Sequence, residues 1–304
     1  MTLDQLRIFV EVAERQHLTQ AAAALHLTPS AVSASIKTLE ERYGTALFDR
    51  VGRRIETNAA GRIFLVEAKR ALAGARAAET TLLEISGMQR GALSIAASQT
   101  IASYWLPQAL VRFRLAYPGI ALTLDVGNTE TVAQAILSGG ADIGLVEGDI
   151  DEPGLARETV GEDKLLVVVA PGHPWATGRA LGAADLIAAQ WILREPGSGT
   201  RSAFEASLAA MGVPAGALHV ALDLPSNEAV RSAVMAGPFA TAISELVVAP
   251  HLRAGLLARA GLDLPARRFS MLRHPDRHRS RAAAAFEDMV RSNTSAQSAT
   301  QGQV

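Results

Sequence analysis

Hydroxyl and amide side chains gather at three places where an apolar, strand-like run gives way to a helix-like run. They are Ser98, Gln99 and Thr100 at the first junction, Asn128 and Thr129 at the second, and Ser198, Gly199 and Thr200 at the third. Such a junction offers backbone N–H groups, a helix dipole and hydroxyl donors, which together suit a carboxylate or an inorganic oxyanion. Helix capping alone would explain any single junction. The expected convergence of all three on one cleft therefore predicts a site for a small anion.

Three further residues belong to this predicted anion site. Arg201, beside the third junction, would add a full positive charge. Glu147 ends a strand-like run and could line the cleft or orient a cationic part of the ligand. Asn227 opens a later helix and could face the same space, because ligands in open α/β sheets lie at the carboxyl ends of strands.

Motifs for catalysis are missing from the sequence. The loop Gly197-Ser198-Gly199 lacks the Gly-Lys-Ser/Thr of a phosphate loop, and no strand–Gly-x-Ser-x-Gly–helix elbow occurs. The chain has no cysteine, which excludes disulfides, thiolate nucleophiles and Cys-ligated zinc. His274 and His278 are four apart but flanked by arginines, so we interpret them as a surface loop. We expect no enzyme, no metal and no cofactor; the small molecule expected at this site is an inorganic oxyanion or a carboxylate.

Strand-like and helix-like runs alternate from residue 91 onward, which predicts an α/β sandwich with mostly parallel sheets. The strand-like runs are Leu93–Ala97, Ala121–Val126, Ile143–Val146, Leu165–Val169, Trp191–Leu193, His219–Leu222, Ala240–Ile243 and Phe269–Leu272. The helix-like runs are Tyr104–Tyr117, Glu130–Ser138, Thr200–Met211, Asn227–Ala236 and Ser280–Arg291. Residues 292–304 hold too little apolar surface to fold, and we expect a disordered tail.

The first 58 residues show a different pattern, with three short helices expected over 3–14, 19–25 and 29–41. Thr19 would cap the second helix, and Thr28 would cap the third with Pro29 in its first position. The residues expected to face inward on the third helix are Ala31, Val32, Ile36 and Leu39. Those left on its outer side are Pro29, Ser30, Ser33, Ser35 and Lys37. A helix, a tight turn and a second helix with an exposed polar start are typical of a helix-turn-helix, although an ordinary helical hairpin has the same spacing.

A basic segment follows this hairpin. Arg50, Arg53 and Arg54 surround a short turn, and residues 55–57 could return as a strand. A solvated turn would account for the arginines alone, but beside a helix-turn-helix they indicate a wing that contacts phosphates. Net charge gives no hint of this, since the chain is −1 overall and residues 1–65 hold eight bases against seven acids. The placement of the charges carries the prediction.

A long helix is expected from Ala59 to Ile85, capped by Asn58. Its apolar stripe comprises Ile63, Val66, Leu72, Ala75, Leu82 and Leu83. At 1.5 Å per residue it would span about 40 Å, which is longer than one small domain. Ser86-Gly87 and Gly91 then mark a hinge.

The N-terminal motifs resemble those of the LysR-type transcriptional regulators. The matching segments are Leu3-Asp4-Gln5-Leu6-Arg7-Ile8-Phe9, Ala21-Ala22-Ala23-Ala24-Leu25, Thr28-Pro29-Ser30-Ala31-Val32-Ser33, Leu39-Glu40, Leu47-Phe48-Asp49-Arg50 and Ala60-Gly61. The family often has Gln at Pro29, and Arg or Gln at Ala34 and Ser35. Ser30, Ser33 and Lys37 are therefore favoured for reading bases, with Thr28, Pro29 and Ser35 in the same predicted surface.

The resemblance implies an architecture and a set of partners. It implies a winged helix-turn-helix domain (1–58), a linker helix and hinge (59–90), and an α/β two-lobed periplasmic-binding-protein-like effector domain (91–291). Lobe one would hold 91–160 and 266–291, and lobe two 161–265. The partners would be double-stranded promoter DNA, a second copy through the linker helix in a dimer or tetramer, and RNA polymerase for an activator.

The function expected from these residues is that of a cytoplasmic regulator whose promoter binding or activation responds to a small anionic metabolite. The alternative is a solute-binding or catalytic protein on the same two-lobed fold, which would leave residues 1–65 unexplained. No stretch of about 20 uncharged apolar residues occurs, so a membrane partner is not expected. The residues around positions 127–130, 145–148 and 198–201 resemble family members tied to sulfur assimilation or carbon fixation.

Overall fold

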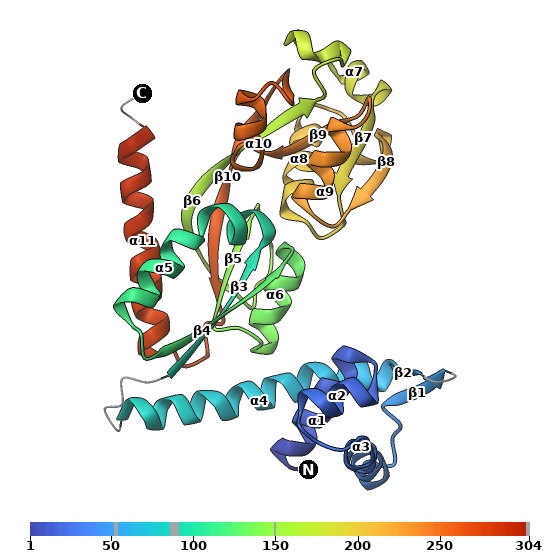
Figure 1. The fold of residues 1–304 in the computed structure, drawn as a ribbon, viewed down its shortest axis with the longest axis vertical. Helices are drawn as coiled ribbons and strands as arrows, with labels where there is room; N and C mark the ends of the chain where they lie inside the picture. The colour runs from blue at the N-terminus through green and yellow to red at the C-terminus, as the bar shows by residue number, and fades with distance from the viewer. Residues whose placement is uncertain (52–53, 86–90, 149, 302–304) are drawn as a thin grey trace. The chain divides into compact units, whose positions relative to one another are not determined.

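The computed structural model describes residues 1–51, 54–85, 91–148 and 150–301 (Figure 1). The chain divides into two compact units, one of residues 1–89 with 138–140 and one of residues 90–137 with 141–304. Among the described residues, no helix is long and apolar enough to cross a membrane. The division at residue 58 and the lobe boundaries stay predictions.

The first unit is built from helices around one apolar core. Its elements are α1 (Leu3–Arg15), α2 (Leu18–Ala24), α3 (Pro29–Tyr43), β1 (Phe48–Val51), β2 (Arg54–Thr57) and α4 (Ala59–Ile85). Phe9 and Val12 of α1 and Val32 of α3 are fully buried in this core. Phe9 also contacts the rings of Phe48 and Phe64, so the short sheet and α4 share the core with the three helices.

Two details of the predicted helices are wrong. The cap of α2 is His17, whose imidazole accepts from the N–H of Gln20, rather than Thr19. Thr19 instead lies inside the first turn, because the helix begins one residue earlier than the alanine run suggests. Ala31 is exposed, since the inward face of α3 repeats through Val32, Ile36 and Leu39 and a residue beside Val32 turns outward.

The long helix α4 has the bounds predicted from the sequence. The Asn58 side chain accepts from the N–H of Gly61 at 2.9 Å, which caps the first turn. Ala68 lies in the core of the first unit. Ile63 and Leu82 of the predicted stripe are 73% and 69% exposed, whereas Leu72 packs against that core, so the stripe is covered only in part within the first unit. The side chain of Leu83, and the predicted hinge at 86–87, lie outside the described residues.

The second unit contains one sheet of eight strands in the order β4-β3-β5-β10-β6-β9-β7-β8. The strands are β3 (Gly91–Ser98), β4 (Ile120–Gly127), β5 (Ile143–Glu147), β6 (Ala156–Val169), β7 (Gln190–Arg194), β8 (His219–Leu224), β9 (Ala240–Ser244) and β10 (Ala258–Arg273). β3 pairs parallel with β4 and β5, and β7 pairs parallel with β8 and β9. Two parallel groups thus lie at the two ends of the sheet.

The long strands β6 and β10 join these groups and pair antiparallel with each other. The prediction of mostly parallel sheets is wrong for them, because β10 pairs antiparallel with β5 and β6 pairs antiparallel with β9. The apolar runs at 165–169 and 269–272 mark only one end of each strand. The remaining parts carry charged residues such as Asp163 and Arg267, which interrupt the apolar pattern.

Helices and short turns cover both groups of strands. They are η1 (Ile101–Trp105), α5 (Pro107–Ala116), α6 (Thr129–Ser138), η2 (Pro174–Thr177), α7 (Ala183–Ala188), α8 (Gly199–Ala210), η3 (Ala215–Ala217), α9 (Asn227–Met235), α10 (Glu245–Arg253) and α11 (Arg281–Gln301). α7 and α10 fall outside the predicted runs. The predicted helix 104–117 is a π-helical turn, η1, followed directly by α5.

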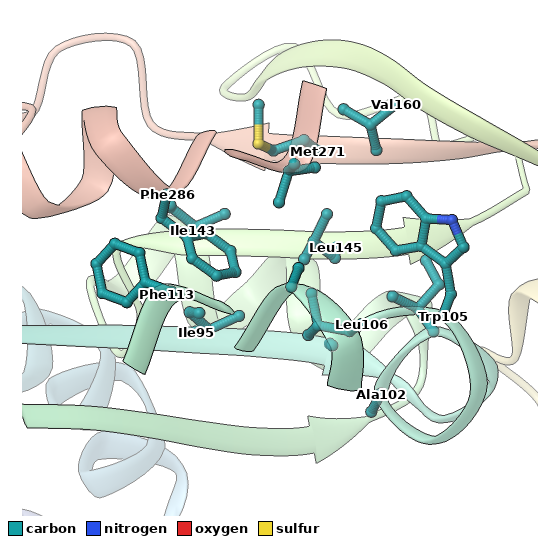
Figure 2. Packing of buried hydrophobic residues seen from close by; sticks show 14 of the residues in the cluster. Ile95, Ala102, Trp105, Leu106, Phe113, Ile143, Leu145, Val160, Met271 and Phe286 are labelled. Atoms are coloured by element: carbon teal, nitrogen blue, oxygen red, sulfur yellow. The ribbon is translucent and has the colours of Figure 1, made fainter. Parts of the chain in front are cut away.

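The last helix, α11, packs on the lobe formed by β3, β4 and β5. Phe286 of α11 meets Phe113 of α5 edge to face at 5.3 Å between ring centroids, beside Ile95 and Ile143 (Figure 2). The chain therefore returns to lobe one, as the resemblance implies. Residues 292–301, which belong to the predicted tail, continue α11, and the disorder of the tail stays a prediction. Low apolar content excludes a packed core there, but Ala, Gln and Ser do not prevent a helix from continuing.

Candidate functional site

The exposed side of α3 presents small polar side chains. Thr28 caps the helix by accepting from the N–H of Ala31 at 3.2 Å, and its hydroxyl lies 3.0 Å from that of Ser30. Thr28, Pro29, Ser30 and Lys37 are exposed, and Ser33 and Ser35 are half-buried. Lys37 makes a surface ion pair with Glu41, at 3.5 Å. Such a pair is worth little and is easily exchanged for another anion.

A two-stranded ribbon, β1 and β2, follows α3 in the sequence. Phe48 to Val51 pair antiparallel with Arg54 to Thr57, and the carboxylate of Glu40 accepts from the N–H groups of Leu47 and Phe48. Glu40 thereby joins the start of the ribbon to α3. Arg50 and Arg54 are exposed on it. Arg53, the third predicted phosphate contact, lies outside the described residues.

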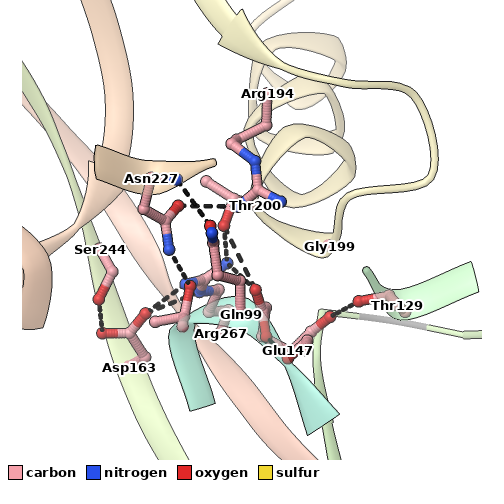
Figure 3. A network of polar contacts seen from close by, with 12 residues as sticks. Gln99, Thr129, Glu147, Asp163, Arg194, Gly199, Thr200, Asn227, Ser244 and Arg267 are labelled. Atoms are coloured by element: carbon pink, nitrogen blue, oxygen red, sulfur yellow. Dashed lines mark hydrogen bonds and ion pairs between the residues drawn. The ribbon is translucent and has the colours of Figure 1, made fainter. Parts of the chain in front are cut away.

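In the second unit, Glu147 at the end of β5 is the centre of a buried polar network (Figure 3). Its carboxylate accepts from the hydroxyl of Ser98 at the end of β3, and its backbone oxygen accepts from Thr129 at 3.0 Å. The Thr200 hydroxyl, in the first turn of α8, lies 3.5 Å from Oε1 of the same carboxylate. All three predicted junctions therefore contribute a side chain here.

Asn227, the first residue of α9, forms a second group of contacts. Its N–H donates to Gln99 at 2.6 Å and its side-chain amide donates to the Thr100 hydroxyl at 3.0 Å. Its side-chain oxygen accepts from Arg194 at 2.8 Å. Because Asn227 is fully buried, these bonds are shielded from water. They join the lobe containing β3 to the lobe containing β7 and β9.

Two predicted residues lie beside this network rather than in it. Asn128 caps α6 by accepting from the N–H of Thr131, and its amide reaches Glu195 at 3.3 Å. Arg201 donates to Glu205 at 2.8 Å and to the backbone oxygen of Arg194 at 3.0 Å. The structure does not bring its guanidinium to Glu147 or Asn227.

The sequence reasoning missed two buried arginines and their partners. Arg267 of β10 donates to Asp163 of β6 at 2.6 and 2.8 Å and to the Thr200 hydroxyl at 2.9 Å. Ser244 also donates to Asp163, at 2.9 Å. Burial raises the pKa of Asp163 above its usual value, although Arg267 and Ser244 lower it. A charged residue inside a strand whose neighbours face a core is the signal that could have pointed to this pair.

Arg194, at the end of β7, is the second of these arginines. It donates to Glu195 at 2.8 and 2.9 Å as well as to Asn227. The pKa of Glu195 is lowered, because the effect of burial, which raises it, is outweighed by Arg194 and its hydrogen bonds. Arg194 and Arg267 therefore face three carboxylates, those of Glu195, Asp163 and Glu147.

The N-terminus of α8 is the least satisfied part of the site. Ser198 is its N-cap residue, yet its hydroxyl makes no capping hydrogen bond. Ser198 is 2% exposed, and its oxygen is one of the buried side-chain atoms without a hydrogen-bond partner in the described part of the chain. A Cβ on the next residue, Gly199, would lie 2.0 Å from the backbone oxygen of Glu147, so only glycine allows this close approach.

No group of three or more His, Asp or Glu side chains that could hold a metal ion occurs in the residues described. The available donors are hydroxyls, amides, a helix N-terminus and buried guanidinium groups. These groups recognise anions.

Comparison with known families decides what the two units are. Residues 3–62 match the bacterial regulatory helix-turn-helix protein, lysR family, and residues 86–295 match the LysR substrate binding domain. The chain belongs to the LysR family of transcriptional regulators. It is thus a DNA-binding regulator with an effector-binding domain rather than an enzyme.

Other LysR-type proteins match along almost the whole chain. The HTH-type transcriptional regulator YeiE of Escherichia coli strain K12 is 38% identical over 290 residues, which cover 95% of this chain and 96% of that protein. A protein of Cyanidioschyzon merolae described as a probable RuBisCO transcriptional regulator is 31% identical and covers 94% of this chain and 96% of its own.

Solved LysR-type structures share the fold. Full-length CbnR in complex with its target DNA has a TM-score of 0.66 at 23% identity, covering 96% of this chain and 100% of that one. The regulatory domain of CcmR from Synechocystis PCC6803, in complex with 2-PG, has a TM-score of 0.61 at 26% identity. It covers 67% of this chain and 98% of its own.

Proposed function

We propose that this regulator binds promoter DNA through α3 and the β1–β2 wing, and that a small anionic metabolite held between its two lobes modulates that binding. The exposed polar start of α3 suits a major groove, and Arg50 and Arg54 suit the phosphates beside it. The effector would contact the junctions that contain Ser98, Thr129 and Thr200.

The buried hydroxyl of Ser198 is the observation that carries the effector site. A buried hydroxyl without a partner costs free energy, and here it stands at the positive end of a 12-residue helix. An anion at this position would accept from the hydroxyl and from the first N–H groups of α8 together. Thr200 and Arg267, which contact each other at 2.9 Å, supply further donors beside it.

Ligand binding at this place would act through the contacts between the lobes. Asn227 with Thr100, and Thr200 with Glu147, are bonds between groups that an incoming ligand would rearrange. A ligand that favours one arrangement of the lobes shifts the population towards it. In the complete assembly this shift would alter how the DNA-binding domains meet their half-sites.

The exposed apolar residues of α4 support a second copy of the chain as a partner. Ile63, Val66 and Leu82 are exposed on a helix of 27 residues, and apolar side chains in such a row are usually covered by another element. A dimer through α4, or a tetramer built from two such dimers, would present paired DNA-reading helices. For an activator, RNA polymerase would be a further partner.

The relatives suggest which anions to test. The CcmR regulatory domain was solved with 2-PG, and several relatives are described as RuBisCO transcriptional regulators. The segments 127–130, 145–148 and 198–201 also resemble those of family members tied to sulfur assimilation. Sulfur oxyanions are candidates for this reason, and they present several acceptor oxygens around one centre. Sulfite, sulfate, phosphate and 2-phosphoglycolate are therefore the probes of choice.

The experiment is a thermal-shift screen of the full chain with these four anions, followed by calorimetric titration. A ligand that binds the native state raises the apparent melting temperature, and the rise grows with the logarithm of the ligand concentration once that concentration exceeds the Kd. Ser198→Ala should weaken binding about tenfold by removing one donor, and it should raise the unliganded stability by about 1 kcal/mol because it removes an unsatisfied buried hydroxyl. Ser202→Ala, on the same helix, removes a hydroxyl that donates only to Gly199 and is the matched control. If none of the four anions binds, the proposed anionic effector is wrong.

A further inference from the structure

We propose that Glu147 is an internal anion that competes with the effector for the donors of Thr200 and Arg267. This inference rests on the proposed function, since it describes what the effector must displace. Glu147 is 1% exposed, so its carboxylate is almost fully removed from water. A buried carboxylate needs donors around it, and here those donors are the groups suited to an external anion.

The two oxygens of Glu147 are held very differently. Oε2 accepts from Ser98, which ends a strand next to β5 in the same lobe. Oε1 faces the other lobe, where it lies 3.5 Å from the Thr200 hydroxyl, and it lies 3.9 Å from Nη1 of Arg267 on β10, a strand that joins the two groups of strands. Both distances exceed those of a strong hydrogen bond, which are about 2.7–3.0 Å. The carboxylate is therefore firmly attached to its own lobe and loosely attached to the opposite one.

The two donors that face Oε1, Thr200 and Arg267, are better satisfied by each other than by Glu147. Nη1 of Arg267 donates to Thr200 at 2.9 Å, and the rest of that guanidinium binds Asp163. The hydroxyl of Ser198, two residues before Thr200, has no partner among the described residues. This face of the second lobe therefore keeps donor capacity that Glu147 does not use.

The charges around the site argue against simultaneous occupancy. Two buried arginines, Arg194 and Arg267, face the carboxylates of Glu195, Asp163 and Glu147. A further anion placed beside Glu147 would add a fourth negative charge to this region. Like charges brought together in a poorly hydrated site repel strongly, so the effector and the Glu147 carboxylate exclude each other.

The competition identifies the class of ligand and a mode of control. The effector is an anion with at least two acceptor oxygens, able to take the donors of Ser198, Thr200 and Arg267 more completely than one carboxylate oxygen does. Without effector, Glu147 connects the lobes through its weak contacts. On binding, the carboxylate would swing away while its attachment to Ser98 keeps it in the first lobe.

The test is calorimetric titration of the full chain and its Glu147→Gln variant with sulfite, sulfate, phosphate and 2-phosphoglycolate. Glutamine keeps an oxygen for Ser98 but removes the charge, so we expect the variant to bind its best anion about tenfold more tightly, which equals ~1.4 kcal/mol. Glu228→Gln is the matched control. Glu228 accepts from Tyr104 at 2.9 Å across the same two lobes but does not touch Thr200 or Arg267, and its variant should stay within about twofold of the wild type.

Each outcome of this titration has a distinct meaning. Tighter binding by the Glu147 variant alone, including binding where the wild type shows none, supports the competition. Unchanged or weaker binding by that variant, with a wild type that does bind, overturns the competition but leaves the anionic effector in place. Failure of both proteins to bind any of the four anions contradicts the proposal of an anionic effector itself. Glu147→Ala, expected to bind at least as tightly as Glu147→Gln, is the second variant if glutamine impairs folding.

Discussion

Thr100 and Asn227, 127 residues apart in the sequence, are joined by a hydrogen bond of 3.0 Å between two fully buried side chains. The oxygen of the same amide accepts from Arg194, and the backbone N–H of Asn227 donates to Gln99. One asparagine thus connects two lobes and a buried cation. Hydrogen bonds between polar side chains therefore hold the two lobes together here. Removing any one of these side chains would leave the hydrogen-bonding group of another unsatisfied.

Replacing these two residues should reveal that coupling. We expect Asn227→Ala to lower the free energy of unfolding by about 2 kcal/mol, because it removes one acceptor of Arg194 and the donor to Thr100, and Thr100→Val to lower it by about 1 kcal/mol. The double variant should cost less than the sum by about 1 kcal/mol. Urea unfolding followed by tryptophan fluorescence measures this cycle, since the three tryptophans are Trp105, Trp175 and Trp191, all in the second unit. Strictly additive losses would show that the two side chains are not coupled.

The pair of Arg267 and Asp163 gives a second prediction. Asp163→Asn removes the charge that compensates a guanidinium only 3% exposed, and breaking a buried pair in this way costs about 3–5 kcal/mol. The pair of Arg291 and Asp288 lies at the surface at the same N–O distance of 2.6 Å, so Asp288→Asn should change stability by less than about 0.5 kcal/mol. Urea midpoints of both variants provide the comparison. Equal midpoints would contradict the burial argument.

The buried pair of Arg267 and Asp163 is also a part of the site that could not be predicted from the sequence. The three junctions could be predicted because hydroxyls at the ends of apolar runs are a local pattern, and Ser98, Thr129 and Thr200 do meet at Glu147. Arg267 and Asp163 lie within strands and meet only because β6 and β10 pair antiparallel. Which charged residues of a long strand turn inward depends on that register, and register is a property of the assembled sheet.

The errors at the helices have a different, local cause. Thr28 and Asn58 were predicted as caps because each precedes a helix with a clear start. The alanine run at 21–24 carries no such boundary, so His17 was missed as the cap of α2. Arg201 was predicted in the site from its place in the chain. Its guanidinium instead donates to Glu205, which lies one helical turn later on α8.

The wing predicts a specific change in DNA affinity. If Arg50 and Arg54 contact phosphates, the double variant Arg50→Ala/Arg54→Ala should bind operator DNA more weakly and reduce the slope of log K against log salt by about 2. Fluorescence anisotropy with labelled promoter DNA at several salt concentrations measures both quantities. Arg179→Ala removes one exposed arginine that pairs with Asp185 in the second unit, and it should leave affinity and slope unchanged. An unaltered slope for the double variant would show that the wing does not contact the phosphates.

Two glycines of α4 allow the last prediction to be tested within a single helix. A Cβ on Gly61 would lie 2.1 Å from the backbone oxygen of Leu47 and 2.7 Å from Cγ2 of Thr57, whereas a Cβ on Gly74 would meet nothing within 4 Å. Gly61→Ala should therefore force the start of α4 away from the loop before β1 and destabilise the first unit by at least about 1–3 kcal/mol.

Gly74→Ala should instead stabilise the first unit by about 0.5–1 kcal/mol, since alanine favours the helix more than glycine does. Because the tryptophans belong to the second unit, far-UV circular dichroism should show an earlier transition for Gly61→Ala while the tryptophan transition stays in place. A shift of both transitions together would mean that the two units unfold as one, and equal effects of the two substitutions would contradict the close approach at Gly61.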